Sequence, residues 1–443
     1  MTASLASAQI SLAPSRLIVV DPGHFHAALL QKEMYPGLAD HVAVYAPLGP
    51  DLLDYLNRIS LFNSRKDKPT HWELEIHCSP DPMEEMLRDR PGTVVVLAGR
   101  NRGKMDRILA SLEANLNVLA DKPWIISSSD LPKLDRALGL AGEKGLVAYD
   151  IMTERYEATS ILQRVLVNDH DVFGRLEQGS ADQPAVSARS VHNVMKVVAG
   201  VTLRRPAWFF DIAEYGEGLA DVGTHVVDLV QWTAFPDQSI DYKKDIQILD
   251  GRRWPLTLTK GQFQQITGDA EFPPSLASQI HDGKLNYFCN NSVHYTLRGS
   301  HVKLDILWNW EAAPGTGDAY EASFRGTKAR VEIRQGQAER YSPELYVVPV
   351  DADMRAEVFD ALKRRIAGLQ REFAGLAVEE RGDEARVVIP AKYRVGHEEH
   401  FAQVANRFFE YLKSPRSIPA WERPNMLAKY YVTTMGVEIA KTK

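Results

Sequence analysis

The chain has 443 residues, of which 44% are hydrophobic and 25% are charged, and its formal net charge is −6. This length suggests two or three domains, and the composition is ordinary for a globular protein. The acidic balance argues against nucleic acid as the main partner, because binding phosphates requires a basic surface. No run approaches the roughly 20 apolar residues that a membrane-spanning helix needs.

The N-terminus and the cysteines bear on the compartment. Residues 1–15 are small and polar and lack the basic and apolar regions of a signal peptide, so we interpret them as a disordered leader. Cys78 and Cys289 match no metal-ligand or redox spacing, which favours two free thiols in a reducing compartment. The sequence therefore favours a cytoplasmic protein without a metal site, and a periplasmic location stays open.

Short apolar runs alternate with helical patterns over residues 16–150. This alternation predicts a Rossmann-type domain, with a doubly wound parallel sheet. The expected strands are Arg16–Asp21, His41–Ala46, Thr93–Leu97, Asn117–Ala120 and Gly145–Tyr149. The expected helices are Phe25–Met34, Lys104–Ala114 and Asp130–Gly142.

The pattern changes within residues 151–443, for which we expect a substrate and oligomerisation domain. Several segments alternate apolar and polar residues, which is typical of antiparallel strands with one wet face. We expect an open, mainly antiparallel sheet with flanking helices. The expected strands are Ala185–Ala199, Asp245–Leu249, Lys284–Leu297, Lys303–Trp310, Ala319–Phe324 and Ala329–Arg334. The expected helices are the charge-rich segment Asp351–Arg386, Glu398–Leu412 and Pro424–Ala440.

A turn, Asp21–His26 (DPGHFH), follows the first expected strand. A dinucleotide-binding fold places G-x-G-x-x-G there, so that the backbone can approach a pyrophosphate. Only the middle glycine is kept, as Gly23. If the loop binds a pyrophosphate, we expect His24 and the backbone N–H groups from Gly23 onward to donate. An ordinary strand–turn–helix connection is the alternative.

A second motif, Asp121-Lys122-Pro123, ends the expected strand Asn117–Ala120. A lysine at the C-terminal end of such a strand faces the crevice where open α/β sheets bind ligands. There it could hydrogen-bond a substrate hydroxyl, and partial burial would lower its pKa. A surface lysine in a turn is the alternative.

A third motif begins at Gly216 and places Asp221, His225 and Asp228 on one face of a helix. An imidazole between carboxylates suits general-base work, so we expect His225 to titrate between roughly pH 6 and 8. We expect Asp228 to hold the other ring nitrogen of His225. A helix with a structural histidine is the alternative.

Together the three motifs resemble the glucose–fructose oxidoreductase/inositol dehydrogenase/MocA family, over most of residues 16–440. Asp121-Lys122-Pro123 is similar to the family's Glu-Lys-Pro, and Gly216–His225 is similar to its G-G-x-x-x-D-x-G-x-H. The resemblance implies a Rossmann domain, a nicotinamide cofactor and an open sheet that often forms the contact in a homo-oligomer. The catalytic set that it implies is Lys122, Asp221 and His225.

The chain departs from the family in its glycine motif and beyond. The family's Pro-Asn-x-x-His keeps only Asn101, and Tyr45-Ala46-Pro47 supplies neither an acidic residue for a ribose nor a basic one for a 2′-phosphate. We therefore expect NAD, with NADP left open. The expected cofactor-binding residues are Pro22, Gly23, His24, Phe25, Gly99, Asn101, Asp121 and Lys122.

The segment from His192 to Asp211 resembles a subgroup whose better-understood relatives oxidise a sugar ring hydroxyl, commonly at carbon 3. The leading hypothesis is such an oxidation of a sugar or glycoside. One alternative is transient oxidation with elimination or glycoside cleavage and a tightly held, recycled NAD; another is a non-catalytic partner subunit. The expected substrate-binding residues are His192, Lys196, Trp208, Asp221 and His225.

Overall fold

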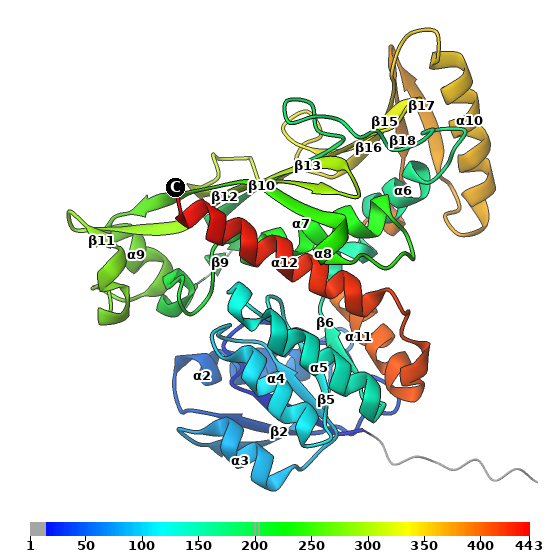
Figure 1. Ribbon diagram of the computed structural model, residues 1–443. Helices are drawn as coiled ribbons and strands as arrows, with labels where there is room; N and C mark the ends of the chain where they lie inside the picture. The colour runs from blue at the N-terminus through cyan, green and yellow to red at the C-terminus, as the bar shows by residue number, and fades with distance from the viewer. Residues whose placement is uncertain (1–14, 199–200, 203) are drawn as a thin grey trace, which may run out of the picture.

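A computed structural model of the chain describes residues 15–198, 201–202 and 204–443. The expected leader lies outside these residues except for Ser15, and so does Ala199 at the end of an expected strand. Figure 1 shows two sheets one above the other, with α12 (Glu422–Lys441) running along the underside of the upper sheet. The junction between the two sheets is therefore the expected place for a functional site.

The N-terminal sheet is parallel and has six strands in the order β3-β2-β1-β4-β5-β6. The expected doubly wound Rossmann-type sheet is thus confirmed. Strand order reverses between β1 and β4, and ligands of such sheets bind in the crevice beyond the strand ends at that point. The strands are β1 (Leu17–Val20), β2 (His41–Ala46), β3 (Glu73–Cys78), β4 (Val94–Leu97), β5 (Asn117–Ala120) and β6 (Ala148–Asp150).

Five helices accompany this sheet: α1 (His26–Leu29), α2 (Pro50–Ser64), α3 (Pro82–Asp89), α4 (Lys104–Glu113) and α5 (Leu131–Lys144). The first helix is shorter than expected from the sequence. The indole N–H of Trp72 donates to the carbonyl of Gln31 at 2.6 Å, so that carbonyl is taken by a side chain outside the helix. Strand β3 was not expected because it is an edge strand of mostly exposed, partly charged residues.

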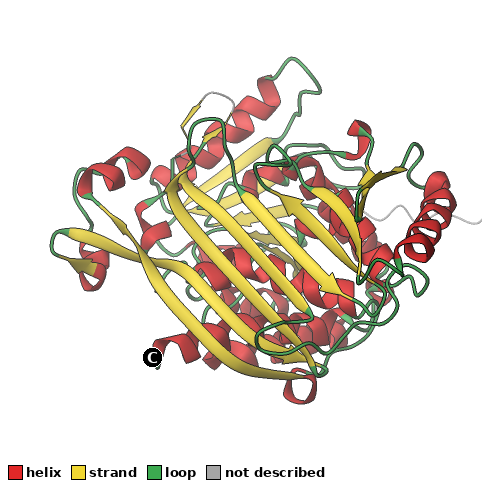
Figure 2. Cartoon of the chain, turned by 90° about the horizontal axis from the view of Figure 1, so that it is seen from above, coloured by secondary structure: helices red, strands yellow, loops and turns green. Residues whose placement is uncertain are grey.

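The second sheet has ten strands and is mainly antiparallel, as expected. Only β7 and β13 pair in parallel among its strands. Figure 2 shows its broad face, with the helices beneath and none across the middle of that face. The larger strands are β7 (Val186–Met195), β10 (Ile246–Leu258), β12 (Lys284–Leu297), β13 (Ser300–Glu311), β14 (Ala319–Arg325), β15 (Ala329–Gln335) and β16 (Glu344–Pro349).

The helices α6 (Ala158–Val167), α7 (Gly218–Ala234) and α12 pack under this sheet through the largest apolar core. The expected long helix Asp351–Arg386 is wrong in its second half. Its first half forms α10 (Arg355–Gly368), which a short 3₁₀ helix at Leu369–Arg371 extends, whereas β17 (Ala377–Arg381) and β18 (Glu384–Val388) form a hairpin. Five-residue stretches that mix charged and apolar residues fit a strand as well as a helix.

The two C-terminal helices reach back to the first sheet. Phe401 and Phe408 of α11 (His397–Lys413) share an apolar core with β1 and β2. Met426 and Tyr430 of α12 join the core on the other face of that sheet. The segment 397–443 thus ties the layers together and brings His397 close to the β1–α1 loop.

Cys78 and Cys289 are both free, one exposed and one buried. Among the described residues, none of the helices has the length and apolar character needed to cross a bilayer.

Candidate active site

A cavity of about 470 Å³ lies between the C-terminal edge of the parallel sheet and the underside of the large sheet. It gathers predicted residues from four separate elements. The β1–α1 loop contributes His24 and Phe25, and the end of β5 contributes Lys122. The predicted residues that also line it are Asp221 and His225 of α7 and His192 of β7.

Lys122 and Asp221 form a buried ion pair across the two layers. Burial by itself would lower the pKa of Lys122, but the Asp221 and Asp121 carboxylates outweigh burial and raise it above its ordinary value. The expected lowering is therefore wrong for the chain alone. The same pairing keeps the pKa of Asp221 below its usual value in spite of burial. The cavity thus presents an ammonium group to whatever binds beside it.

Asp121, next to that lysine, is held by two imidazoles of the β1–α1 loop. His24 Nδ1 lies 2.7 Å from one carboxylate oxygen, and His26 Nδ1 lies 2.8 Å from the other. Burial lowers the pKa of His26 to about 4, so this imidazole is neutral at pH 7. Sequence reasoning treated His26 only as a lost glycine and missed this arrangement; its alternation with His24 in H-x-H was the available signal.

His225 faces the cavity from one turn beyond Asp221. Its Nδ1 is buried and has no hydrogen-bond partner within the described part of the chain. Burial, together with the charge of Lys122, lowers the pKa of His225 well below its usual value. The expected titration between pH 6 and 8 is therefore wrong, and the imidazole is in its basic, neutral form throughout that range.

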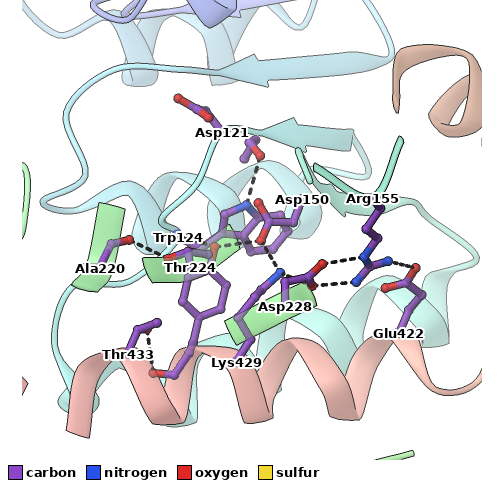
Figure 3. A network of polar contacts seen from close by, with 12 residues as sticks. Asp121, Trp124, Asp150, Arg155, Ala220, Thr224, Asp228, Glu422, Lys429 and Thr433 are labelled. Atoms are coloured by element: carbon purple, nitrogen blue, oxygen red, sulfur yellow. Dashed lines mark hydrogen bonds and ion pairs between the residues drawn. The ribbon is translucent and has the colours of Figure 1, made fainter. Parts of the chain in front are cut away.

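Asp228 does not hold His225, contrary to expectation. Arg155 donates to both of its oxygens, at 2.6 and 2.7 Å, and Lys429 approaches it at 3.3 Å. Figure 3 shows Asp228 between these two cations, with Arg155 reaching on to Glu422. These contacts fasten α7 to α12 and to the segment after β6.

The same network continues to the strand end that carries Lys122. Lys429 pairs with Asp150 at 3.0 Å (Figure 3). The Tyr430 hydroxyl donates to Asp150 at 2.8 Å. Tyr430 in turn accepts the backbone N–H of Trp124 at 3.0 Å. Both sides of the Lys122–Asp221 pair are therefore anchored to one helix, α12.

His192 is oriented by its neighbours on the large sheet. Its Nδ1 lies 3.0 Å from Asp318, and its Nε2 lies 2.8 Å from the Ser190 hydroxyl. Lys196 also pairs with Asp318 but lines a different cavity. The structure thus brings His192 into the main cavity and leaves Lys196 outside it.

The other side of the β1–α1 loop faces the crevice at the β1–β4 switch point. A Cβ atom added at Gly23 would lie 3.0 Å from the Trp208 ring and 3.1 Å from the Asp51 carboxylate. The indole N–H of Trp208 donates to Asp51 at 3.0 Å, and Arg100 pairs with Asp51 at 3.1 Å. Trp208 is therefore placed against this loop and not in the cavity.

The backbone N–H groups expected to meet a pyrophosphate are partly used within the protein. Gly23 donates to the Asp21 carbonyl at 2.8 Å, and His24 donates to the Ala98 carbonyl at 3.0 Å. Gly99 approaches the same loop so closely that an added Cβ would lie 2.4 Å from the Asp21 carbonyl oxygen. Pro22 is buried.

The side chain of Asn101 is buried and makes two hydrogen bonds. It donates to the Tyr215 carbonyl at 2.6 Å and accepts from Lys104 Nζ at 2.6 Å. These contacts join the loop after β4 to the segment before α7, so Asn101 supports the architecture of the site from outside the cavity.

Several cavity residues escaped sequence reasoning because no local motif marks them. Glu154 is the most informative, because burial and the nearby Glu157 raise its pKa to about 7. His397, whose pKa burial lowers to about 3, comes from the far C-terminal helix. The others that carry a polar or aromatic group are Glu157, Thr159, Ser160, Ser190, Arg205, Tyr215, Asp318, Tyr320 and Gln335.

Comparison with known proteins identifies the chain's relatives. The sequence model of a family described as "Putative oxidoreductase C terminal domain" matches residues 162–441. A solved structure titled "putative oxidoreductase" from Parabacteroides merdae ATCC 43184 is 42% identical, with a TM-score of 0.95 over 97% of this chain and 98% of that one. No curated protein sequence matches the chain.

More distant structures share the fold. A 3-ketoreductase from Actinomadura kijaniata, solved with NADP and TDP-benzene, is 14% identical, with a TM-score of 0.56 over 97% of each chain. GenD2 from gentamicin A biosynthesis, solved with NAD, is 15% identical, with a TM-score of 0.56 over 97% of this chain and 95% of that one. The chain belongs to the oxidoreductase family that the C-terminal domain defines, and it is of the glucose–fructose oxidoreductase/inositol dehydrogenase/MocA type.

Proposed function

We propose that this oxidoreductase interconverts a secondary hydroxyl and a ketone on a sugar or glycoside, at carbon 3, with NAD(P) as hydride carrier. The observation that carries the proposal is the convergence of Lys122 and His225 on one cavity. They come from different layers, and the Lys122–Asp221 pair joins those layers. A neutral imidazole can accept the proton of an alcohol, and an ammonium group can stabilise the charge that develops on its oxygen, so the pair suits alcohol oxidation.

The crevice at the β1–β4 switch point suits a dinucleotide, on one condition. Arg100 and Arg107 lie beside the Gly23 loop, where they pair with Asp21 at 3.7 and 3.2 Å and could instead meet a diphosphate. The Trp208 ring, however, lies where the diphosphate would approach Gly23. A dinucleotide therefore fits once the indole moves aside. The preference for NAD over NADP remains a prediction. It is based on the end of β2, which offers no basic residue for a 2′-phosphate.

The protein's own groups then divide the work. A nicotinamide held at the switch-point crevice beside the Gly23 loop would supply the acceptor for the hydride of the alcohol carbon. His225 accepts the hydroxyl proton, because its lowered pKa keeps a nitrogen lone pair available at neutral pH. Lys122 donates a hydrogen bond to the same oxygen and stabilises its developing charge, while Asp221 orients the ammonium group.

The rest of the cavity suits a polyhydroxylated substrate. The Arg205 guanidinium lies 5.4 Å from the Trp308 ring centre, and the His192 ring, tilted by 34°, lies 5.1 Å from the same ring. Donors of fixed orientation next to an aromatic face are the usual elements of carbohydrate recognition, because one side of a sugar is apolar and its edges are polar.

The test measures the reduction of NAD or NADP that accompanies oxidation of each sugar or glycoside in a panel. His225→Asn should lower the oxidation rate by about 10²–10⁴-fold, which is the usual contribution of an acid–base group. His170→Asn, at an exposed histidine, is the matched control. Full activity of the His225 variant would contradict the role proposed for it.

A second candidate is redox-neutral: transient oxidation at carbon 3 followed by elimination or glycoside cleavage, with the cofactor retained. The position of Trp208 favours it, because a residue that must move before exchange slows both entry and release. Cofactor released only on denaturation, with turnover but no net reduction of added NAD, would distinguish this candidate from the first.

A further inference from the structure

Three potential metal ligands meet at the wall of the cavity. His24 and His26, two residues apart, lie just after β1, and Asp121 lies just after β5. One donor atom from each residue lies within 4.8 Å of the others. The shared feature is a pair of imidazoles gathered on one carboxylate, at a place where the fold ordinarily carries glycines.

We propose that His24, His26 and Asp121 bind a divalent first-row transition-metal ion, of which Zn²⁺ is the best fit. Two histidines and one carboxylate form a recurrent catalytic metal site that leaves coordination positions open. Nitrogen ligands favour such ions over Mg²⁺ and Ca²⁺, which prefer oxygen. The proposal goes beyond the oxidoreductase function and does not require it.

The distances permit entry of an ion with small movements. The imidazole nitrogens lie 2.7 and 2.8 Å from the carboxylate oxygens. Bonds of about 2.0–2.2 Å to one metal place ligand atoms roughly 3.3 Å apart in tetrahedral geometry. The groups therefore need to separate by well under about 1 Å each. Each imidazole can bind the ion through Nδ1 when its hydrogen lies on Nε2.

The surroundings hold the ligands, and neither Lys104 nor Lys122 pairs with the Asp121 carboxylate. The His26 ring stacks on His397 at 5.1 Å and packs on Phe401 at 5.3 Å, which limits its rotation. Lys104 donates to the backbone carbonyl of Asp121 at 2.9 Å, so it does not compete for the carboxylate oxygens. The Lys122 ammonium pairs instead with Asp221.

The open coordination positions of a metal bound there would face the cavity. His24 and His26 both line it together with Lys122 and His225. A metal there would polarise a substrate oxygen from the side opposite α7. The chain also offers an internal comparison: His77, Glu85 and Asp89 form a second cluster of similar size but at the surface, where such clusters are common without an ion.

The experiment measures metal content and needs no turnover. Full-length protein is stripped with a chelator, returned to one equivalent of Zn²⁺ and examined by elemental analysis and calorimetric titration. We expect one equivalent to bind to the wild type. His26→Ala and the less buried His24→Asn should each weaken binding by at least about 100-fold, the upper range for loss of an outer-shell partner. His77→Ala, the matched control, should leave binding unchanged.

Circular dichroism of each variant shows whether it has folded, and His24→Asn keeps the test informative if His26→Ala does not fold. Anomalous diffraction at the zinc edge should place the ion about 2.0–2.2 Å from both imidazoles and the carboxylate. A wild type that binds no Zn²⁺ would overturn the proposal. So would binding that survives both loop substitutions and disappears in His77→Ala.

Discussion

Two aspartates on helix α7, seven residues apart, meet opposite environments. Asp221 faces the cavity and, among the described residues, pairs with one cation, Lys122. Asp228 faces the interior and pairs with two, Arg155 and Lys429. Burial acts on both carboxyls, yet cationic partners hold the pKa of both below normal, to about 2 for Asp228.

The difference lies in what surrounds each pair. A charged group whose partners saturate it, far from water, contributes to the structure and has nothing left to offer a ligand. A charged group with a single partner beside a cavity can exchange that partner for a substrate oxygen. The comparison predicts that breaking the interior network costs mainly stability, whereas breaking the cavity pair costs mainly turnover.

The largest effect on stability should follow Arg155→Met. It leaves Asp228 with only the more distant Lys429 and Glu422 without its 2.7 Å partner. Removing one partner of a buried ionic network typically costs about 3–5 kcal/mol of unfolding free energy. Denaturant unfolding measures it. Arg136→Met is the control, because Arg136 forms a surface pair with Glu113 that should contribute at most about 1 kcal/mol.

Lys122→Met should act in the opposite way. We expect turnover to fall by about 10²–10³-fold, the usual cost of removing a donor aimed at developing negative charge. The unfolding free energy should change less than in Arg155→Met, since the cavity can admit water to the Asp221 carboxylate. Steady-state kinetics and denaturant unfolding together decide the matter, with the surface substitution Lys133→Met as control. A variant with normal turnover would place Lys122 among the structural pairs.

The sequence predicted the residues of this site that lie within local motifs, and it did not predict contacts between residues that are far apart along the chain. Lys122, Asp221 and His225 were found because each sits in a local motif at the end of a strand or on one helical face. The partners of Asp228 lie 73 and 201 residues away, and no local pattern marks them. Spacing alone therefore assigned Asp228 to His225 when the fold gives it to Arg155.

The same distinction applies to the fold: the sequence predicted the central strands, but not the edge strand or the C-terminal hairpin. The central strands β1, β4 and β5 are apolar runs that tertiary contacts only confirm. The edge strand β3 and the hairpin β17–β18 carry mixed, exposed residues, and their pairing partners decide their conformation. His397 joined the site only because α11 packs on the first sheet, which its sequence does not specify.

A third acidic residue of the region, Glu154, sharpens the comparison because it has no cationic partner within salt-bridge distance among the described residues. Its pKa is raised from 4.5 to about 7 by burial and by Glu157. A raised folded pKa means that the stability from this group is complete below pH 4.5 and is lost as pH rises through 7. Glu154→Gln should therefore become more stable than the wild type between pH 5 and 8, by at most roughly 3 kcal/mol. Thermal unfolding of both proteins across that range measures it, and a difference independent of pH would contradict it.

The smallest effect concerns a fourth carboxylate, Asp51, which is intermediate: one cation, Arg100, and one neutral donor, Trp208. The Arg100 guanidinium also lies over the Trp208 ring, 5.1 Å from the centre of that ring. A hydrogen bond and an exposed cation–π contact together amount to about 1–2 kcal/mol, which a dinucleotide must displace. We therefore expect Trp208→Ala to tighten NAD binding by roughly tenfold, because the covered form of the loop no longer competes.

Calorimetric titration and stopped-flow exchange of NAD test this expectation, with Trp254→Ala at an exposed tryptophan of the large sheet as control. Faster association in the Trp208 variant would show that the indole obstructs the crevice, as its contact with Gly23 implies. Weaker binding would show instead that the indole packs on the bound dinucleotide. In that case Asp51 and Arg100 would belong with the cavity pair, because their partner would be exchanged for a ligand, and the division between exchangeable and saturated charges would extend to both sides of the β1–α1 loop.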